Sequence, residues 1–172
     1  EAAVEQPEIE GLFLLTAPLS AEGLDAGRFR ALVDEAKEYF DFVFMDSPAG
    51  LGEGFQLARA AADRVVVVSA VDPAALRDAQ RTVAELHDLP TLHLVMNRVQ
   101  PRLITRLRTS IDQAMDAAGL PLLGVVPEDP AVTLAAAAGV PLILTTYKGA
   151  APAYLNISKR LLGQRVPLTR IR

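Results

Sequence analysis

The chain has 172 residues, of which 51% are hydrophobic and 22% are charged, and its net charge is −4. This composition excludes an intrinsically disordered chain, and no apolar run approaches the length of a membrane-spanning helix. Because there is no cysteine, disulfides and thiolate metal sites are excluded, and the cytoplasm is the expected compartment. The two histidines, His87 and His93, lack a second ligand at metal spacing, so we interpret them as surface or strand residues.

The apolar periodicity predicts strands that alternate with helices along most of the chain. In the first part of the chain, we expect a strand at Leu12–Thr16, a helix over Asp25–Phe40, a strand at Phe42–Met45 and a helix over Gly54–Ala62. In the middle, we expect a β-branched strand at Val65–Val68, a helix over Pro73–Leu86, a strand at Leu92–Met96 and an apolar helical stripe from Ile104 to Ala118. In the last part, we expect a strand at Leu122–Val126, a helix over Ala131–Ala138, a short strand at Leu142–Leu144 and a final helix from Tyr154 to Leu162.

This alternation predicts the fold class. Strands separated by helices of 10 to 15 residues form βαβ units, and such units build a mostly parallel sheet. Right-handed crossovers then place helices on both faces of that sheet. We therefore expect an α/β fold in which residues 1–172 form a single domain.

Two strand-to-helix junctions share an Asp-Pro pair, Asp72-Pro73 and Asp129-Pro130. The aspartate is a good acceptor for an early helical N–H, and proline suits the first helical position. Both side chains are therefore expected to cap helices at the carboxyl edge of the sheet.

Asp46 follows the apolar run Phe42–Met45 and precedes a Ser-Pro-Ala-Gly turn that ends at Gly50. The carboxyl end of a strand is where open α/β sheets bind ligands. In a nucleotide enzyme such an aspartate holds Mg²⁺ through water, and the glycine lets the backbone approach a phosphate. The alternative interpretation is that Asp46 only begins a turn.

Two later strands also end in polar segments, Asn97-Arg98 and Pro127-Glu128-Asp129. An asparagine can offer both a donor and an acceptor to a purine edge, and an arginine can stack on the ring. Pro127 would supply a rigid apolar wall. Taken alone, an Asn-Arg pair at a strand end is more typical of a turn than of a base-binding site.

Together these segments resemble the MinD/ParA family of deviant Walker A ATPases, and its MinD branch most of all. The resemblance covers nearly the whole chain. Asp46–Gly50 is similar to the Walker B and switch II segment, Ser69–Arg81 to the strand–helix junction after it, Asn97-Arg98 and Pro127–Asp129 to the adenine-binding elements, and Gly139–Ile143 with Leu161–Gly163 to the C-terminal pattern.

The resemblance implies a three-layer α/β/α fold of the P-loop NTPase type, with ATP and Mg²⁺ as cofactors. By this resemblance, Asp46 is the catalytic residue that orders Mg²⁺ through water, and Gly50 senses the γ-phosphate. Asn97 and Arg98 contact the adenine, and the backbone of Pro127, Glu128 and Asp129 closes its other side.

The resemblance also implies partners. Arg77 and Asp78 would lie on the face where family dimers meet or bind regulators. A MinD-like protein would dimerise with ATP, bind a division inhibitor and an ATPase-activating regulator, and reach the inner membrane through a C-terminal helix. It would thereby position the division septum from the cytoplasm, and it would bind no nucleic acid.

Two features depart from the family pattern. Gly52 stands where the family often has an acidic residue, and Glu53 comes one position later. No Gly-Lys-Thr or Gly-Lys-Ser segment occurs, so we expect an incomplete domain without the N-terminal strand and phosphate loop. ATP and Mg²⁺ binding by this chain alone is then expected to be weak or absent, and the chain to be inactive.

The C-terminal region is unusually basic. Residues 130–172 carry six Lys or Arg and no Asp or Glu, against 11 basic and 21 acidic residues in the rest of the chain. An ordinary solvated surface is one interpretation, and attraction to an anionic surface is the other. The chain stops at Arg170-Ile-Arg172, so the lipid-binding helix of MinD-like proteins is expected to be cut off or absent.

Three functional hypotheses remain open at this point. The first is part of a MinD-like septum-positioning ATPase. The second keeps the family but assigns a ParA-like partition or flagellar-number role. The third is a pseudo-ATPase interaction module, against which the retention of Asp46, Gly50 and Asn97 argues.

Overall fold

The computed structural model describes residues 3–7, 9–16, 23–107 and 110–169. The chain divides into two compact units, Glu1–Ala62 and Asp63–Arg172, and each is described by itself.

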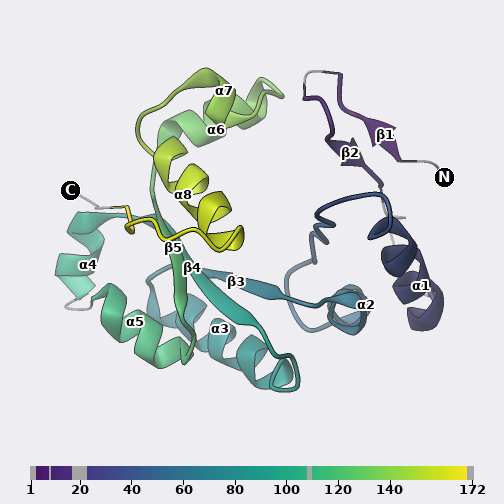
Figure 1. Cartoon of the computed structure of the whole chain (residues 1–172). Coiled ribbons are helices and arrows are strands. Elements are labelled where there is room, and N and C mark those ends of the chain that lie inside the picture. Colours follow the sequence, from purple (N-terminus) through teal and green to yellow (C-terminus); the bar gives the residue numbers. More distant parts are fainter. Residues whose placement is uncertain (1–2, 8, 17–22, 108–109, 170–172) are drawn as a thin grey trace. The chain divides into compact units, whose positions relative to one another are not determined.

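The second unit is built on a parallel sheet with the strand order β3–β4–β5 (Figure 1). Its strands are β3 (Val65–Ser69), β4 (Leu92–Val99) and β5 (Leu122–Pro127). Their apolar and β-branched residues suit strands that are covered on both faces. The register of β3 and β4 runs from Val65 beside Leu92 to Ser69 beside Met96. This confirms the predicted α/β class.

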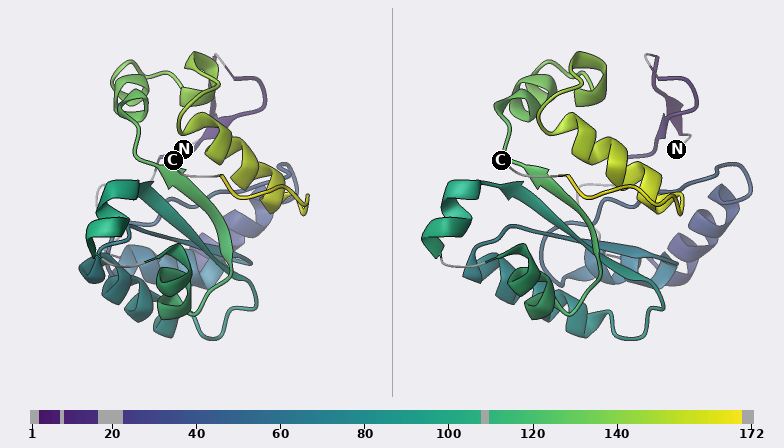
Figure 2. Two further views of the ribbon diagram at one scale, coloured as in Figure 1. Left: turned by 90° about the vertical axis from the view of Figure 1, so that its left-hand side faces the viewer. Right: turned by 60° about the vertical axis from the view of Figure 1, so that its left-hand side comes forward.

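Helices cover both faces of this sheet (Figures 1 and 2). On one face α3 packs beside α5, and the Gln80 side chain donates to the Ala117 carbonyl at 2.8 Å. On the other face α8 lies along β5. The helices of the unit are α3 (Pro73–Glu85), α4 (Pro101–Leu107), α5 (Ile111–Ala118), α6 (Pro130–Ala137), α7 (Leu142–Thr145) and α8 (Ala151–Leu161).

The contact between α8 and β5 forms part of the hydrophobic core of the second unit. Val95, Leu123 and Val126 of the sheet pack with Ala150 and Ala153 at the start of α8. Gly124 lies so close to Ile157 that a Cβ at position 124 would overlap that side chain. The position of α8 is therefore fixed by close apolar contact.

Val166 and Pro167, beyond the end of α8, lie beside that helix. Arg160 donates from Nη1 to the carbonyls of Leu122 and Leu123, at 3.0 and 3.3 Å, and from Nε to the carbonyl of Val166 at 3.1 Å. One turn earlier in α8, the Asn156 amide donates to the Pro167 carbonyl at 3.4 Å. At least Arg160 of the basic region is therefore a structural residue rather than a solvated charge.

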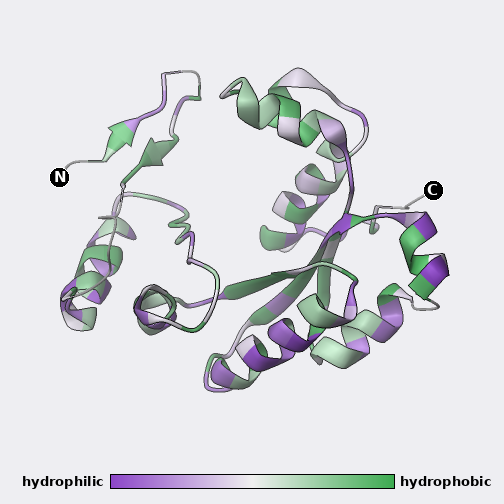
Figure 3. Ribbon diagram, turned by 180° about the vertical axis from the view of Figure 1, so that it is seen from behind, coloured by the Kyte–Doolittle hydropathy of each residue, from purple (hydrophilic) through white to green (hydrophobic). Residues whose placement is uncertain are grey.

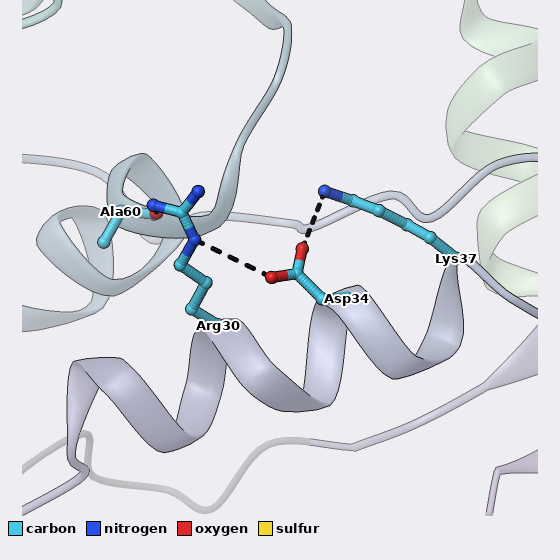
Figure 4. Close-up of polar contacts among 4 residues, drawn as sticks. All are labelled: Arg30, Asp34, Lys37 and Ala60. Carbon is cyan, nitrogen blue, oxygen red and sulfur yellow. Dashed lines mark hydrogen bonds and ion pairs between the residues drawn. The ribbon is translucent and has the colours of Figure 1, made fainter.

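The described part of the first unit contains a short antiparallel ribbon of β1 (Val4–Glu5) and β2 (Phe13–Leu14), followed by the helices α1 (Ala26–Ala36) and α2 (Glu53–Ala61). Asp34 of α1 pairs with Arg30 at 3.7 Å and Lys37 at 3.2 Å (Figure 4). Arg30 also donates to the Ala60 carbonyl at 3.4 Å, which links α1 to α2. These charges are exposed, so the packing of α1 on α2 depends mainly on their apolar faces.

Three expectations about elements are wrong. Phe42–Met45 forms no strand, because a strand needs a hydrogen-bonding neighbour and none of the described strands pairs with it. The apolar stripe from Ile104 to Ala118 is two helices, because Ser110 begins α5 with a capping box to Gln113. Leu142–Leu144 is helical rather than extended.

Hydropathy follows the layers of the second unit, with hydrophobic strands and mixed helices (Figure 3). None of the helices described is both long enough and apolar enough to cross a membrane.

Candidate functional site

The carboxyl ends of β4 and β5 bring together most of the residues predicted to contact a base. At Asn97-Arg98 the pairing of the two strands is irregular, since Met96 pairs with Val125 and Val99 pairs with Pro127. One extra residue therefore lies on the β4 side, which is the geometry of a β-bulge. Arg98 has φ +54°, a value that non-glycine residues rarely adopt.

The Asn97 side chain stabilises this bulge. Its Oδ1 accepts a hydrogen bond from the backbone N–H of Arg98 at 3.0 Å. The amide NH₂ group remains a donor pair, and Oδ1 retains a second lone pair, so the half-buried side chain keeps both functions that a purine edge requires. The predicted base-binding asparagine therefore also shapes its own turn.

Glu128 connects the two strand ends. Its carboxylate accepts from Gln100 through Nε2 and from Arg98 through Nη2, the latter at 3.2 Å. The hydrogen bond from Gln100, followed by that from Arg98, lowers the pKa of the Glu128 carboxyl. This network holds the Arg98 guanidinium at the sheet edge, although 74% of that side chain stays exposed.

Asp129 is placed differently from Glu128. Its Oδ1 accepts from the N–H of Ala131 at 2.9 Å and so caps α6, as predicted. Its Oδ2 accepts from the N–H of Ala150 at 2.9 Å, immediately before α8. Asp72, at the other Asp-Pro junction, accepts only from Ala74 and Ala75 of its own helix among the bonds described.

Asp46 and Gly50 belong to the first unit. Both lie in the loop before α2, and both are exposed. Gly50 has φ +89°, so the turn requires a glycine at this position. The structure brings together the candidate residues of the second unit, and the place of Asp46 beside them stays a prediction.

Arg77 and Asp78 are exposed on α3. Asp78 pairs with Arg81 of the same helix at 3.5 Å, and both side chains are about three-quarters exposed. An exposed pair within one helix contributes little to stability, so these charges remain available to a partner. Their role at a partner face stays a prediction.

The residues of the second unit fit a base better than they fit a metal. The donors and acceptors of Asn97, the guanidinium of Arg98 and the half-buried Pro127 suit an adenine. Within residues 3–7, 9–16, 23–107 and 110–169, no three or more His, Asp or Glu side chains gather in a metal-binding group. A Mg²⁺ ion that takes most of its ligands from water and phosphate needs no such group, so the Mg²⁺ role of Asp46 stays a prediction.

A hollow of about 350 Å³ lies elsewhere in this unit, between α6, α7 and α8. Its lining is apolar and includes Val132, Leu142 and Tyr154, so it does not suit a phosphate.

Sequence reasoning missed Gln100, Gly149 and Ala150 at the predicted site. Gln100 lies beyond the predicted end of the strand at Leu92–Met96. Gly149 lies against the Asp129 carboxylate in the structure, and no local pattern predicts that contact.

The chain is similar to proteins named for septum placement. It is 31% identical to the septum site-determining protein MinD of Synechocystis, over 97% of this chain and 65% of that protein. The MinD cell division protein of Aquifex aeolicus superposes with a TM-score of 0.89 at 28% identity, covering 98% of this chain and 71% of that one. No protein-family model matches. These likenesses confirm the resemblance to MinD/ParA proteins that the sequence predicts.

A second Aquifex structure, a MinC:MinD cell division protein complex, also superposes with a TM-score of 0.89, over 70% of that chain. The chain spans just under two thirds of the length of its Synechocystis relative.

Proposed function

We propose that this chain is part of a protein that binds and hydrolyses ATP and positions the division septum. The observation that carries the proposal is the edge formed by the Asn97-Arg98 bulge and the Pro127–Asp129 segment, in a chain whose relatives are named septum site-determining proteins. A Pyrococcus furiosus neighbour, 25% identical with a TM-score of 0.70, is described as the cell division ATPase MinD.

The proposed roles follow from chemistry and position. Asn97 and Arg98 contact the adenine from β4, and the backbone of Pro127–Asp129 closes the opposite side. Asp46 holds Mg²⁺ through water, and Gly50 approaches the γ-phosphate. When bound, Mg²⁺ would supply positive charge and ATP the phosphate that reacts, while these residues would bind and orient both.

The wider role involves partners. In this proposal the intact protein forms a dimer with ATP, lies in the cytoplasm and at the inner membrane, and uses the α3 face with Arg77 and Asp78 to bind a division inhibitor or an activator. The Aquifex MinC:MinD complex supports a division-inhibitor partner.

The proposal is tested first in cells. Deletion of the gene that encodes this chain should produce misplaced septa and anucleate minicells. The full-length gene should restore normal division, and an Asp46→Ala version should not. Normal septum placement in the deletion strain would refute the septum role and would turn attention to chromosome partition or flagellar number.

The enzymatic part is tested on purified protein. We expect the full-length gene product to hydrolyse ATP, with Asp46→Ala reducing the rate and Asn97→Ala raising KM. The 172-residue chain alone should show no turnover. Vigorous ATP hydrolysis by the 172 residues would contradict the assigned dependence on a phosphate loop.

A further inference from the structure

The carboxylate of Asp129 joins two helices that are far apart in the sequence. Oδ1 accepts from Ala131 at the start of α6, and Oδ2 accepts from Ala150 at the start of α8, each at 2.9 Å. Ala150 is fully buried, so its N–H would lack a water partner if Asp129 moved away.

Gly149 encloses the same carboxylate. It has φ +62°, and a Cβ at this position would overlap Oδ2 of Asp129. A side chain at position 149 is therefore disfavoured both by backbone conformation and by space. The carboxylate is held between the Ala131 N–H on one side and the Gly149–Ala150 backbone on the other.

This arrangement determines where the end of β5 lies. Asp129 directly follows Pro127 and Glu128, so its side chain fixes the backbone of that segment against α8. The start of α8 is itself packed on the sheet through Ala150 and Ala153. The segment is thus anchored by its own strand and by a second, buried element.

We propose that Asp129 is a positioning residue for the adenine side of the nucleotide site, and that its link to Gly149 and Ala150 determines base selectivity. This inference rests on the proposed function, because it assigns a role within that same site. Both carboxylate oxygens already accept backbone hydrogen bonds, so Asp129 acts through the position of the Pro127–Asp129 backbone. Displacement of such a wall by about 1 Å is enough to weaken recognition of a base.

The test is the affinity of the full-length gene product for Mg-ATP and Mg-GTP. Asp129→Asn can still cap α6 through its amide oxygen, but its NH₂ group would face the Ala150 N–H, donor against donor. We expect its ATP affinity, relative to GTP, to fall about tenfold, the equivalent of roughly one hydrogen bond. Asp72→Asn is the matched control, because Asp72 also caps its own helix and none of its described bonds reaches α8; it should leave the ratio unchanged.

Gly149→Ala provides a second variant that displaces the carboxylate from the α8 side. It should also lower the ATP-to-GTP ratio, with folding verified by circular dichroism and the unfolding midpoint. Equal losses for ATP and GTP in Asp129→Asn, or an unchanged ratio in both folded variants, would overturn the positioning role. If the unmodified protein binds no ATP, the proposed function itself fails, which is a different result from ATP binding that is insensitive to Asp129.

Discussion

The two Asp-Pro junctions of the second unit share the sequence Asp-Pro-Ala but have different structural roles. Asp72 accepts from two N–H groups of α3, at 3.1 and 3.0 Å. Asp129 accepts from one N–H of α6 and one N–H at the start of α8. The first junction connects β3 to α3. The second connects β5 to α6 and also bonds to the start of α8, on the opposite face of the sheet from α3.

This difference shows what a local motif can and cannot predict. An N-cap depends on residues within three positions of the aspartate, so both caps follow from the sequence pattern. The bond to Ala150 spans 21 residues and depends on where α8 packs. A cap is thus a local property, while the added bond is a consequence of the tertiary fold.

The largest expected effect is the loss of stability in Asp129→Ala compared with Asp72→Ala. Each variant loses a helix cap, at about 1 kcal/mol, and Asp129→Ala also leaves the buried Ala150 N–H unpaired, at about 1–3 kcal/mol more. The free energy of unfolding from urea titration should therefore fall by about 2–4 kcal/mol for Asp129→Ala and about 1 kcal/mol for Asp72→Ala. Equal losses would remove the distinction between the two junctions.

The next effect is expected at two glycines at helix ends, Gly119 after α5 and Gly149 before α8. Gly119 and Gly149 both have positive φ, at +67° and +62°, but a Cβ at Gly119 would have nothing within 4 Å. Gly119→Ala should therefore cost about 1–2 kcal/mol from backbone conformation alone. Gly149→Ala should cost more, because its methyl also displaces the Asp129 carboxylate; thermal or urea unfolding of the two variants compares them directly.

The smallest effect is the pH dependence of the Glu128 network. Because Gln100 and Arg98 lower the pKa of the folded Glu128 carboxyl, its stabilisation is present above the ordinary value of 4.5 and is lost as the pH falls through the lowered pKa. Glu128→Gln should thus be slightly less stable than the unmodified chain at pH 7, with the difference shrinking below pH 4.5. A difference that stays constant from pH 7 to pH 3 would show that the carboxylate charge contributes nothing.

The fold was largely predictable because strong periodicity marks its elements. Val65–Ser69 is β-branched almost throughout, and its strand was found where the pattern placed it. Phe42–Met45 shows the limit of that reasoning, since an apolar run becomes a strand only beside a partner strand. Ser110 shows another, because a single capping residue divided an apolar stripe that looks continuous.

The positions of the candidate site residues at strand ends were predictable from the sequence, but the contacts between them were not. Asn97, Arg98 and Glu128 were recognised by type and position at strand ends. The bulge at Asn97-Arg98 and the bond from Gln100 to Glu128 depend on the register of β4 against β5, which local pattern does not determine. Gly149 has no signal in the sequence, because its requirement comes from a carboxylate 20 positions earlier in the chain.

The most direct test of the link between Asp129 and α8 is a double-mutant cycle of Asp129→Ala and Gly149→Ala, with unfolding free energies measured in urea. In the double variant the methyl at position 149 no longer meets a carboxylate, so the combined loss should be smaller than the sum of the single losses by more than about 1 kcal/mol. Losses that add to within about 0.5 kcal/mol would contradict the account, because they would mean that the two residues act independently.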